Sequence, residues 1–356
     1  MNRLILIGNG FDLAHNLETS YKHFLSDYWK SIINLMINNR QNRIRGEFNN
    51  NQVTIGKKMI VYHKIDDILN FIRQNISAIN FKNKFLGQIT KKQSFENWVD
   101  IEYEYFENLK KVKAHPEQLK ELNSDFNEIK TLLITYLKKI NLDEAKSNFK
   151  LKRKIRKLIY ESFSEQDFTN EIIENEFDAH PKEILFLNFN YTQTESIYEN
   201  ISESQTNDIE KDIKTSTIHI HGTLKNDLSN PVIFGYGDEI DEEYKELEKL
   251  NNTACLDFIK SIAYLDSSNY KSLLSFINSD YYQILIMGHS CGVSDRTLLN
   301  TIFEHKNCCS IKPYYYQIDM HNDNYSDLIK NITRNFHNKA MMRERVVNKT
   351  FTKTLA

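Results

Sequence analysis

The chain has 356 residues, enough for one large domain or for a core that carries a substantial insertion. Its 40% hydrophobic and 26% charged residues are typical of a globular protein and exclude a disordered one. A net charge of -2 excludes a strong overall attraction to nucleic acid or anionic lipid, so we expect neither as a partner.

The first feature along the chain is a short apolar run at residues 4–7, which ends in Gly8, Asn9 and Gly10. A helical pattern follows over about 24–36, and the order strand, glycine turn, helix is how dinucleotide-type folds begin. The apolar run is too short for a signal peptide or a membrane span. The four cysteines form no C-x-x-C pair, so we expect a cytoplasmic protein with reduced thiols and no membrane contact.

A long helical region follows, after a polar stretch at 38–52 that reads as a loop. From 58 to 178 the apolar residues recur at helical spacing, which predicts an all-helical insertion over 38–179. Two such faces are prominent, one at Ile65, Ile68, Leu69, Ile72, Ile76 and Ile79, and one running from Leu119 to Ile140. The dense basic run at 150–157 fits the solvated face of a helix.

Strand signals return after Pro181, at residues 184–189, 218–220, 232–234, 284–287 and 314–318. They alternate with helical or polar stretches, which favours a mostly parallel sheet covered by helices on both faces. The sequence therefore predicts a Rossmann-like α/β core formed by 1–37 and 180–340. Residues 341–356 read as a basic tail.

Polar residues follow four of these strands, at the edge of the sheet where ligands of open α/β folds bind. They are Gly8, Asn9, Gly10, Phe11 and Asp12; Asn190, Tyr191 and Thr192; His221; and Gly288, Ser290 and Asp295. Glycines there let the backbone approach a pyrophosphate at a helix N-terminus. We expect these four segments to converge on one nucleotide site.

Each segment also has a structural explanation. The glycines fit a tight turn, and an Asn after an apolar run often caps the next helix. His219 and His221 alternate onto one face, as a metal pair would. The sequence offers no third ligand near them, so we expect no metal.

Residues 4–15, Leu-Ile-Leu-Ile-Gly-Asn-Gly-Phe-Asp-Leu-Ala-His, resemble the opening of the bacteriophage abortive-infection AbiH family. Thr19, Ser20 and Tyr21 extend this resemblance, and the segments 97–102, 188–192, 219–222 and 288–290 resemble the same family. The resemblance implies an antiviral role with a phage-derived trigger or partner protein. It leaves the oligomeric state open, a homo-oligomer being one option.

The same skeleton is similar, more distantly, to the sirtuin-like NAD-consuming domains of bacterial antiviral systems. In that resemblance Asn190 matches the family's Asn, and His221, before Gly222, matches its His. Gly8, Gly10 and Asp12 match the nucleotide loop, while Gly288 and Ser290 match its Gly-x-Ser. The chain lacks the four-cysteine zinc module of deacylating sirtuins, and its loop continues Asn-Gly-Phe-Asp-Leu. The resemblance implies hydrolysis of NAD, or of a related nucleotide, as substrate with no further cofactor.

The chemistry of these residues fits cleavage of the nicotinamide–ribose bond. Asn190 is able to hold a water below C1′, and neutral His221 is able to accept a proton from it. Ser290 and Asp295 are placed to bind the adenosine ribose. Nicotinamide is already a cationic leaving group, so the reaction needs no metal.

Two other functions remain open. The residues 288–292 read G-x-S-x-G, the nucleophile elbow of serine hydrolases, with Ser290 as nucleophile. Its partners would be Asp295 or Asp319 with His321 or His337, although little chain follows Ser290 to complete that fold. The third possibility is a nucleotide sensor without catalysis, whose helical insertion is the partner surface.

Overall fold

The computed structural model describes residues 1–41, 48–56, 65–96, 100–169, 180–199, 213–225 and 229–355. The chain divides into two compact units. The first contains Met1–Leu17, Ile140–Lys245 and Ile259–Ala356, and the second contains Glu18–Lys139 and Glu246–Phe258. The predicted boundaries lay after 37 and 179, whereas the compact units divide after Leu17 and Lys139.

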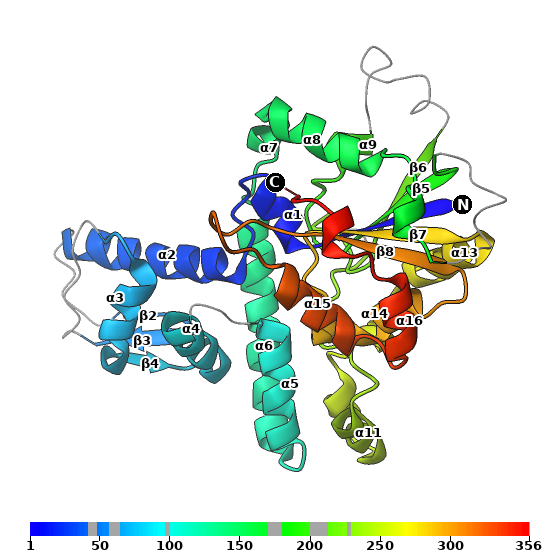
Figure 1. Ribbon diagram of the computed structural model, residues 1–356. Coiled ribbons are helices and arrows are strands. Elements are labelled where there is room, and N and C mark those ends of the chain that lie inside the picture. Colours follow the sequence, from blue (N-terminus) through cyan, green and yellow to red (C-terminus); the bar gives the residue numbers. More distant parts are fainter. Residues whose placement is uncertain are drawn as a thin grey trace. The chain divides into compact units, whose positions relative to one another are not determined.

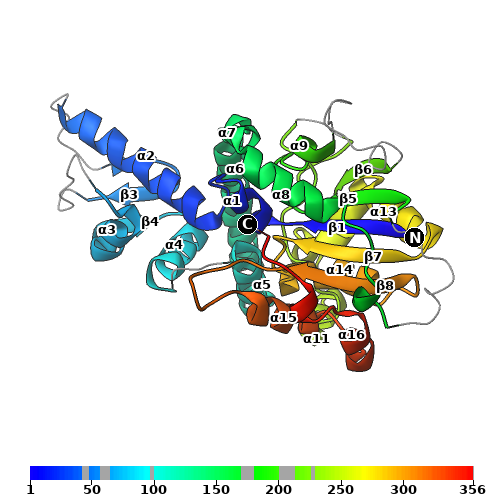
Figure 2. The ribbon, with the colours of Figure 1, turned by 45° about the horizontal axis from the view of Figure 1, so that its top comes forward.

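The first unit is built on a five-stranded sheet in which every neighbouring pair of strands is parallel. The central strand β1 pairs through Ile5 with Phe186 on one side and with Leu285 on the other. The order is β6-β5-β1-β7-β8, as Figure 2 shows. The strands are β1 (Asn2–Ile7), β5 (Glu183–Asn188), β6 (Lys214–His219), β7 (Tyr282–Met287) and β8 (Cys308–Tyr314).

This strand order places a switch point beside β1. The chain passes from β1 to β5 and β6 on one side, and then returns to β7 and β8 on the other. The segments that follow β1 and β7 therefore leave the sheet next to each other and lead to opposite sides. A crevice at such a point, outside the carboxyl ends of the strands, is where open α/β sheets bind ligands.

Helices cover both faces of this sheet, because alternate residues of β1 face opposite ways. Ile5 and Ile7 pack in a core with α1 (Asn9–Ala14), α8 (Phe149–Ile159) and α9 (Ser196–Glu199). Leu4 and Leu6 pack in a second core with the helices of the other face (Figure 1). Those helices are α13 (Asn269–Ser279), α14 (Arg296–Phe303), α15 (Tyr325–Arg334) and α16 (Lys339–Arg345). The first unit also contains α7 (Asp143–Ser147) and α12 (Lys260–Ala263).

Two predicted strands of the core are wrong. Residues 232–234 form no strand. They lie in a loop in which Ile233 and Phe234 are buried, and this burial explains the apolar run. Ile233 N–H donates to His221 O. The predicted strand at 314–318 begins where β8 ends. The sequence did not indicate β8 because Ser310 and Lys312 interrupt its apolar pattern, although both are buried.

The predicted basic tail at 341–356 is also wrong, because these residues pack against the sheet as far as 355. Val346 forms a bridge with Ile311 of β8, and Thr354 forms one with Tyr315. Leu355 belongs to the apolar core around Ile5 and Ile7. The charged residues of this segment dominate its composition, so the few apolar residues that pack it against the first unit were not recognised.

The second unit is mostly helical but contains a small antiparallel sheet, so the all-helical prediction is wrong. Its strands β2 (Phe48–Asn49), β3 (Val53–Ile55) and β4 (Ile79–Phe81) have the order β2-β3-β4. Ile76 and Ile79, assigned by spacing to a helix face, lie in a 3₁₀ turn and in β4. The second predicted face is confirmed from Leu119 to Leu137, where the apolar residues of one helix are buried. The helices are α2 (Tyr21–Gln41), α3 (Ile68–Gln74), α4 (Lys84–Glu96), α5 (Ile101–Val112) and α6 (Pro116–Leu137), with α11 (Glu242–Lys249) crossing the boundary between the units.

Asn97, Trp98 and Val99, which carried part of the family resemblance, lie outside the described residues. Within the described ranges no helix combines the length and apolarity needed to cross a membrane.

Candidate functional site

The loops after β1 and β7 touch backbone to backbone at the switch point. Gly10 N–H donates to Gly288 O at 2.8 Å. A Cβ at Gly8 would lie 2.6 Å from the Cα of His289, and one at Gly288 would lie 2.0 Å from Phe11 N. Gly288 also has a φ of +77°, which favours glycine. The glycines predicted to approach a pyrophosphate are thus required by the approach of the two loops to each other.

The rest of the predicted nucleotide loop lies mostly inside the protein. Phe11 is fully buried against His15 and Tyr198. Asp12 is buried and accepts a hydrogen bond from Thr192 Oγ1 at 2.6 Å, which joins the loops after β1 and β5. Asn9, by contrast, is exposed. Phe11, Asp12 and Thr192 therefore shape this edge of the sheet and do not line it.

Asn190 lies half-buried at the end of β5. Its backbone N–H donates to Asn188 Oδ1 at 2.7 Å, and its Nδ2 donates to Gly8 O at 3.0 Å. Its amide oxygen has no hydrogen-bond partner among the described residues, so this oxygen remains available to a ligand or water. The neighbouring Tyr191 donates from its hydroxyl to Ile233 O at 2.8 Å.

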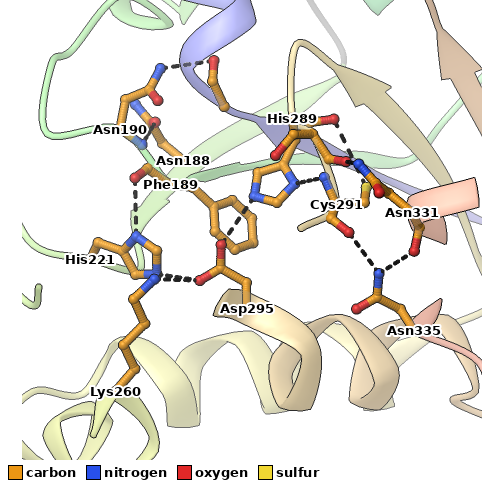
Figure 3. A network of polar contacts seen from close by, with 12 residues as sticks. Asn188, Phe189, Asn190, His221, Lys260, His289, Cys291, Asp295, Asn331 and Asn335 are labelled. Atoms are coloured by element: carbon orange, nitrogen blue, oxygen red, sulfur yellow. Dashed lines mark hydrogen bonds and ion pairs between the residues drawn. The ribbon is translucent and has the colours of Figure 1, made fainter. Parts of the chain in front are cut away.

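A buried charged group, here called the edge cluster, consists of His221, Lys260, His289 and Asp295 (Figure 3). Asp295 Oδ1 lies 2.8 Å from Lys260 Nζ and 3.1 Å from His221 Nε2. Lys260 is 1% exposed and His221 is 4% exposed. A carboxylate with an ammonium and an imidazole on the same oxygen is held firmly in its charged form.

His289 approaches the other oxygen of the same carboxylate. Its Nδ1 accepts a hydrogen bond from Cys291 N–H at 3.0 Å, so the proton of the neutral ring is on Nε2. That nitrogen lies 3.6 Å from Asp295 Oδ2. Asp295 therefore has nitrogen groups from three different segments around it.

The pKa values of Asp295 and His221 are both lowered in this cluster, with opposite effects on charge. Burial alone would raise the pKa of Asp295, but Lys260 and His221 hold it well below its ordinary value. The pKa of His221 is lowered by burial and by the charge of Lys260, and Asp295 offsets only part of this. At neutral pH the cluster therefore contains an ammonium, a carboxylate and a neutral His221.

The neutral His221 ring is left one proton short. Its Nδ1 lies 3.1 Å from Phe189 O and its Nε2 lies 3.1 Å from Asp295 Oδ1, and both oxygens only accept. Tyr264 OH lies 3.4 Å from Nε2 and is able to donate to it. A proton taken up by this ring would satisfy both oxygens, so the site is arranged for proton uptake.

The two residues predicted to be catalytic come from neighbouring strand ends but turn different ways. The Asn190 amide donates to Gly8 O, whereas Figure 3 shows the His221 ring directed toward Asp295. Asp295, predicted as a ribose contact, is instead buried at the centre of the edge cluster.

Sequence reasoning missed Lys260 and His289. Lys260 lies in α12, far along the chain from any strand end, and its neighbourhood has no motif. His289 is the middle residue of the Gly-x-Ser segment, in which Ser290 was interpreted as the functional residue.

Ser290 does not have the surroundings of an activated nucleophile. Its side chain is exposed, and within the described ranges its hydroxyl contacts no histidine. Asn331 Nδ2 and Asn335 Nδ2 bind the carbonyls of Ser290 and Cys291, both at 2.9 Å. The φ of 54° belongs to Cys291, the residue after the serine.

The hydrolase partners considered for Ser290 are engaged elsewhere. Asp319 accepts hydrogen bonds from His321 N–H and Asn322 N–H within its own turn. His337 contacts Glu304. No catalytic triad forms around Ser290 in the described part of the chain.

The two histidines of β6 and its following turn bind different carboxylates. His219 Nε2 lies 3.0 Å from Glu195 Oε1, whereas His221 contacts Asp295. Glu195 also accepts from Asn188 Nδ2 at 2.5 Å. The described residues contain no group of three or more His, Cys, Asp or Glu side chains placed to hold a metal ion.

The sequence matches the family model described as bacteriophage abortive infection AbiH over residues 4–317. This range includes all four strand-end segments. No curated protein matches the sequence.

Proposed function

We propose that this chain, which belongs to the bacteriophage abortive infection AbiH family, acts in that response by hydrolysing NAD at the nicotinamide–ribose bond. Family membership suggests the role in abortive infection. The reaction and its substrate are our inference. The observation that carries it is the edge cluster, a neutral histidine held against a buried carboxylate at the switch point of a parallel sheet.

The topology supports a dinucleotide as the ligand. The order β6-β5-β1-β7-β8 corresponds to strands 3-2-1-4-5 of the doubly wound dinucleotide-binding fold. In that fold the ligand crosses the carboxyl edge beside the central strand. Asn9, Asn190 and Ser290 present polar groups at this edge and retain exposed or half-exposed surface.

The proposed reaction is a substitution at C1′ of the nicotinamide ribose. Water bonds to C1′, the bond from C1′ to the nicotinamide nitrogen breaks, and nicotinamide leaves as a neutral molecule. The amide oxygen of Asn190 positions the water or a ribose hydroxyl. His221 accepts the released proton, and Asp295 stabilises the resulting imidazolium.

The experiment measures nucleotides in phage-infected cells that express the chain, because infection supplies the trigger. We expect NAD to fall while nicotinamide and ADP-ribose rise together, and we expect His221→Ala cells to keep their NAD. Unchanged NAD in cells that still block the phage would contradict the proposal. A fluorophosphonate probe should not label Ser290, since no base activates it.

The burial of His221 and Asp295 also favours a second function, a nucleotide sensor without turnover. A sensor would still need the site to fold and bind, but not to transfer a proton. His221→Gln, which keeps a hydrogen-bonding side chain, separates the two. Loss of both NAD cleavage and protection supports the enzyme, and retained protection supports the sensor.

A further inference from the structure

The second unit contains a cavity of about 830 Å³ that plays no part in the edge cluster. It is lined by residues of β4, α4 and α5. This volume lies in the range of cavities that hold small organic ligands. The composition of its walls indicates which ligand it fits.

The walls are strongly basic. Lys84, Lys91, Lys92 and Lys111 line the cavity, against the single carboxylate of Glu104. Lys92 binds Glu104, and Lys84 binds Glu121 at 2.7 Å. In the described ranges no carboxylate lies within ion-pair distance of Lys91 or Lys111. These two ammonium groups therefore line the cavity without direct ion-pair contact to a carboxylate of the described residues.

The walls also carry aromatic rings. Phe95 lines the cavity and is 63% exposed, so most of its side chain is open to a ligand. The guanidinium of Arg73 lies 5.8 Å from the centre of its ring. The ammonium of Lys91 lies 5.9 Å from the centre of the Phe81 ring. Cations and ring faces are thus interleaved along one surface.

We propose that this cavity binds a phosphorylated nucleobase, supplied by a free nucleotide or by a segment of single-stranded nucleic acid. The base stacks on the exposed ring of Phe95, and the phosphate pairs with Lys91 and Lys111. Aromatic stacking combined with lysines along the backbone is how proteins bind such ligands without reading sequence. The site is separate from the NAD chemistry proposed above and does not depend on it.

An acidic peptide is the other ligand that four lysines would attract. Its carboxylates would pair with the lysines, but the peptide would make no use of the exposed ring of Phe95. A nucleotide uses both features, so the observations favour it. The test therefore has to separate charge from stacking.

The experiment uses the full chain and the fluorescence anisotropy of a labelled, short oligothymidylate. Unlabelled oligothymidylate, AMP, pyrophosphate and polyglutamate compete for binding in separate arms. We expect the oligonucleotide or AMP to compete well, and pyrophosphate and polyglutamate to compete poorly. AMP competing as well as the oligonucleotide identifies a free nucleotide as the ligand, and an oligonucleotide advantage identifies the strand. Equal competition by polyglutamate would overturn the proposal in favour of an acidic peptide.

Variants locate the binding in the cavity. Phe95→Ala should weaken oligonucleotide binding by about tenfold, within the range measured for stacked aromatic residues. Lys91→Gln and Lys111→Gln should each reduce the slope of log affinity against log salt by about one. Lys120→Gln, an exposed lysine of α6 outside the cavity, is the matched control and should leave binding unchanged. All these positions are exposed, so the variants should fold; wild-type affinity in Phe95→Ala would overturn the proposal.

Discussion

The first unit buries two charged clusters that differ in what they contain. The edge cluster lies in the loops beyond the sheet and surrounds one carboxylate with a lysine and two histidines. The other, here called the strand cluster, lies beside β1, β7 and β8, and its members are Arg3, Glu161, Asp167, Gln283 and Lys312.

The strand cluster is balanced, with two cations against two carboxylates. Lys312 Nζ contacts Glu161 at 2.8 Å and Asp167 at 2.9 Å. Arg3 donates to two backbone carbonyls and to Gln283 Oε1. Each cation of this cluster is matched by a carboxylate or by carbonyl oxygens, so we interpret the cluster as structural.

The edge cluster has one lysine and one carboxylate, and its remaining members are imidazoles. His221 is neutral and both of its ring nitrogens face acceptor oxygens. A second proton on this ring would therefore complete a hydrogen bond, and the strand cluster contains no such imidazole. Buried charge alone is therefore a weak sign of function. A buried imidazole that faces two acceptors, at the carboxyl ends of the strands, is a stronger one.

The largest expected effect is on stability, from Asp295→Ala. Removing this carboxylate breaks its buried ion pair with the ammonium of Lys260, which typically costs about 3–5 kcal/mol of unfolding free energy. Urea unfolding of the variant measures the loss. Asp319→Ala, which removes an exposed carboxylate, should change the unfolding free energy far less. Equal stability of the two variants would contradict the burial of charge at the edge.

The next effect is on turnover and separates the clusters by role. His221→Ala and Asn190→Ala should each lower NAD hydrolysis by about 10²-fold or more, because they remove proton transfer and positioning. Glu161→Gln in the strand cluster should keep kcat at a temperature where the variant is folded. Product formation followed by chromatography gives these rates. A fall in kcat for Glu161→Gln as large as for His221→Ala would remove the distinction.

A smaller effect is expected from the glycine that brings the edge loops together. Gly288→Ala places a Cβ against Phe11 N at a positive φ, and such strain costs roughly 1–3 kcal/mol. Gly292→Ala is the matched control, since its nearest neighbour would be 3.6 Å away. That variant should stay within about 0.5 kcal/mol of the wild type. Thermal unfolding of both proteins tests the difference.

The smallest effect is the pH dependence of stability. Because the pKa of His221 is lowered in the folded state, the unfolded chain binds its proton more readily. Stability from this group is complete above the unfolded pKa of about 6.5 and is lost as the pH falls below it. His221→Gln should therefore reduce the slope of unfolding free energy between about pH 7 and pH 5. An unchanged slope would assign the pH dependence to other buried groups, such as His15, whose pKa is lowered by burial too.

The strand cluster should not respond in this window. Burial would raise the pKa of Glu161, but Lys312 and Tyr314 hold it below its ordinary value. Its contribution is therefore lost only when the pH falls below about 4.3. Glu161→Gln should leave the slope between about pH 7 and pH 5 as it is in the wild type.

The sequence predicted the parallel sheet because β1, β5 and β7 are buried on both faces and read as continuous apolar runs. It misplaced β8, whose Ser310 and Lys312 are compensated by partners that only the fold brings near. It missed β2, β3 and β4 because strands of two or three residues are too short to show a period of two.

The strand-end segments that the sequence singled out do contact one another. Their role as a nucleotide site stays a prediction. The alternation of polar residues after apolar runs located Asn190, His221 and Asp295. No local pattern indicates that Asp12 is bound by Thr192, or that Lys260 reaches Asp295. Such pairings depend on side chains that are distant in sequence.

The central position of β1 governs when the site comes into existence during synthesis. β1 is synthesised first, but its hydrogen-bonding partners β5 and β7 are synthesised much later. Gly10 finds the carbonyl of Gly288 only after nearly the whole first unit has left the ribosome. A nascent or truncated chain that stops before β7 lacks His289 and Asp295 and has no edge cluster. The edge cluster therefore exists only in molecules whose synthesis has passed β7 and the loop that follows it.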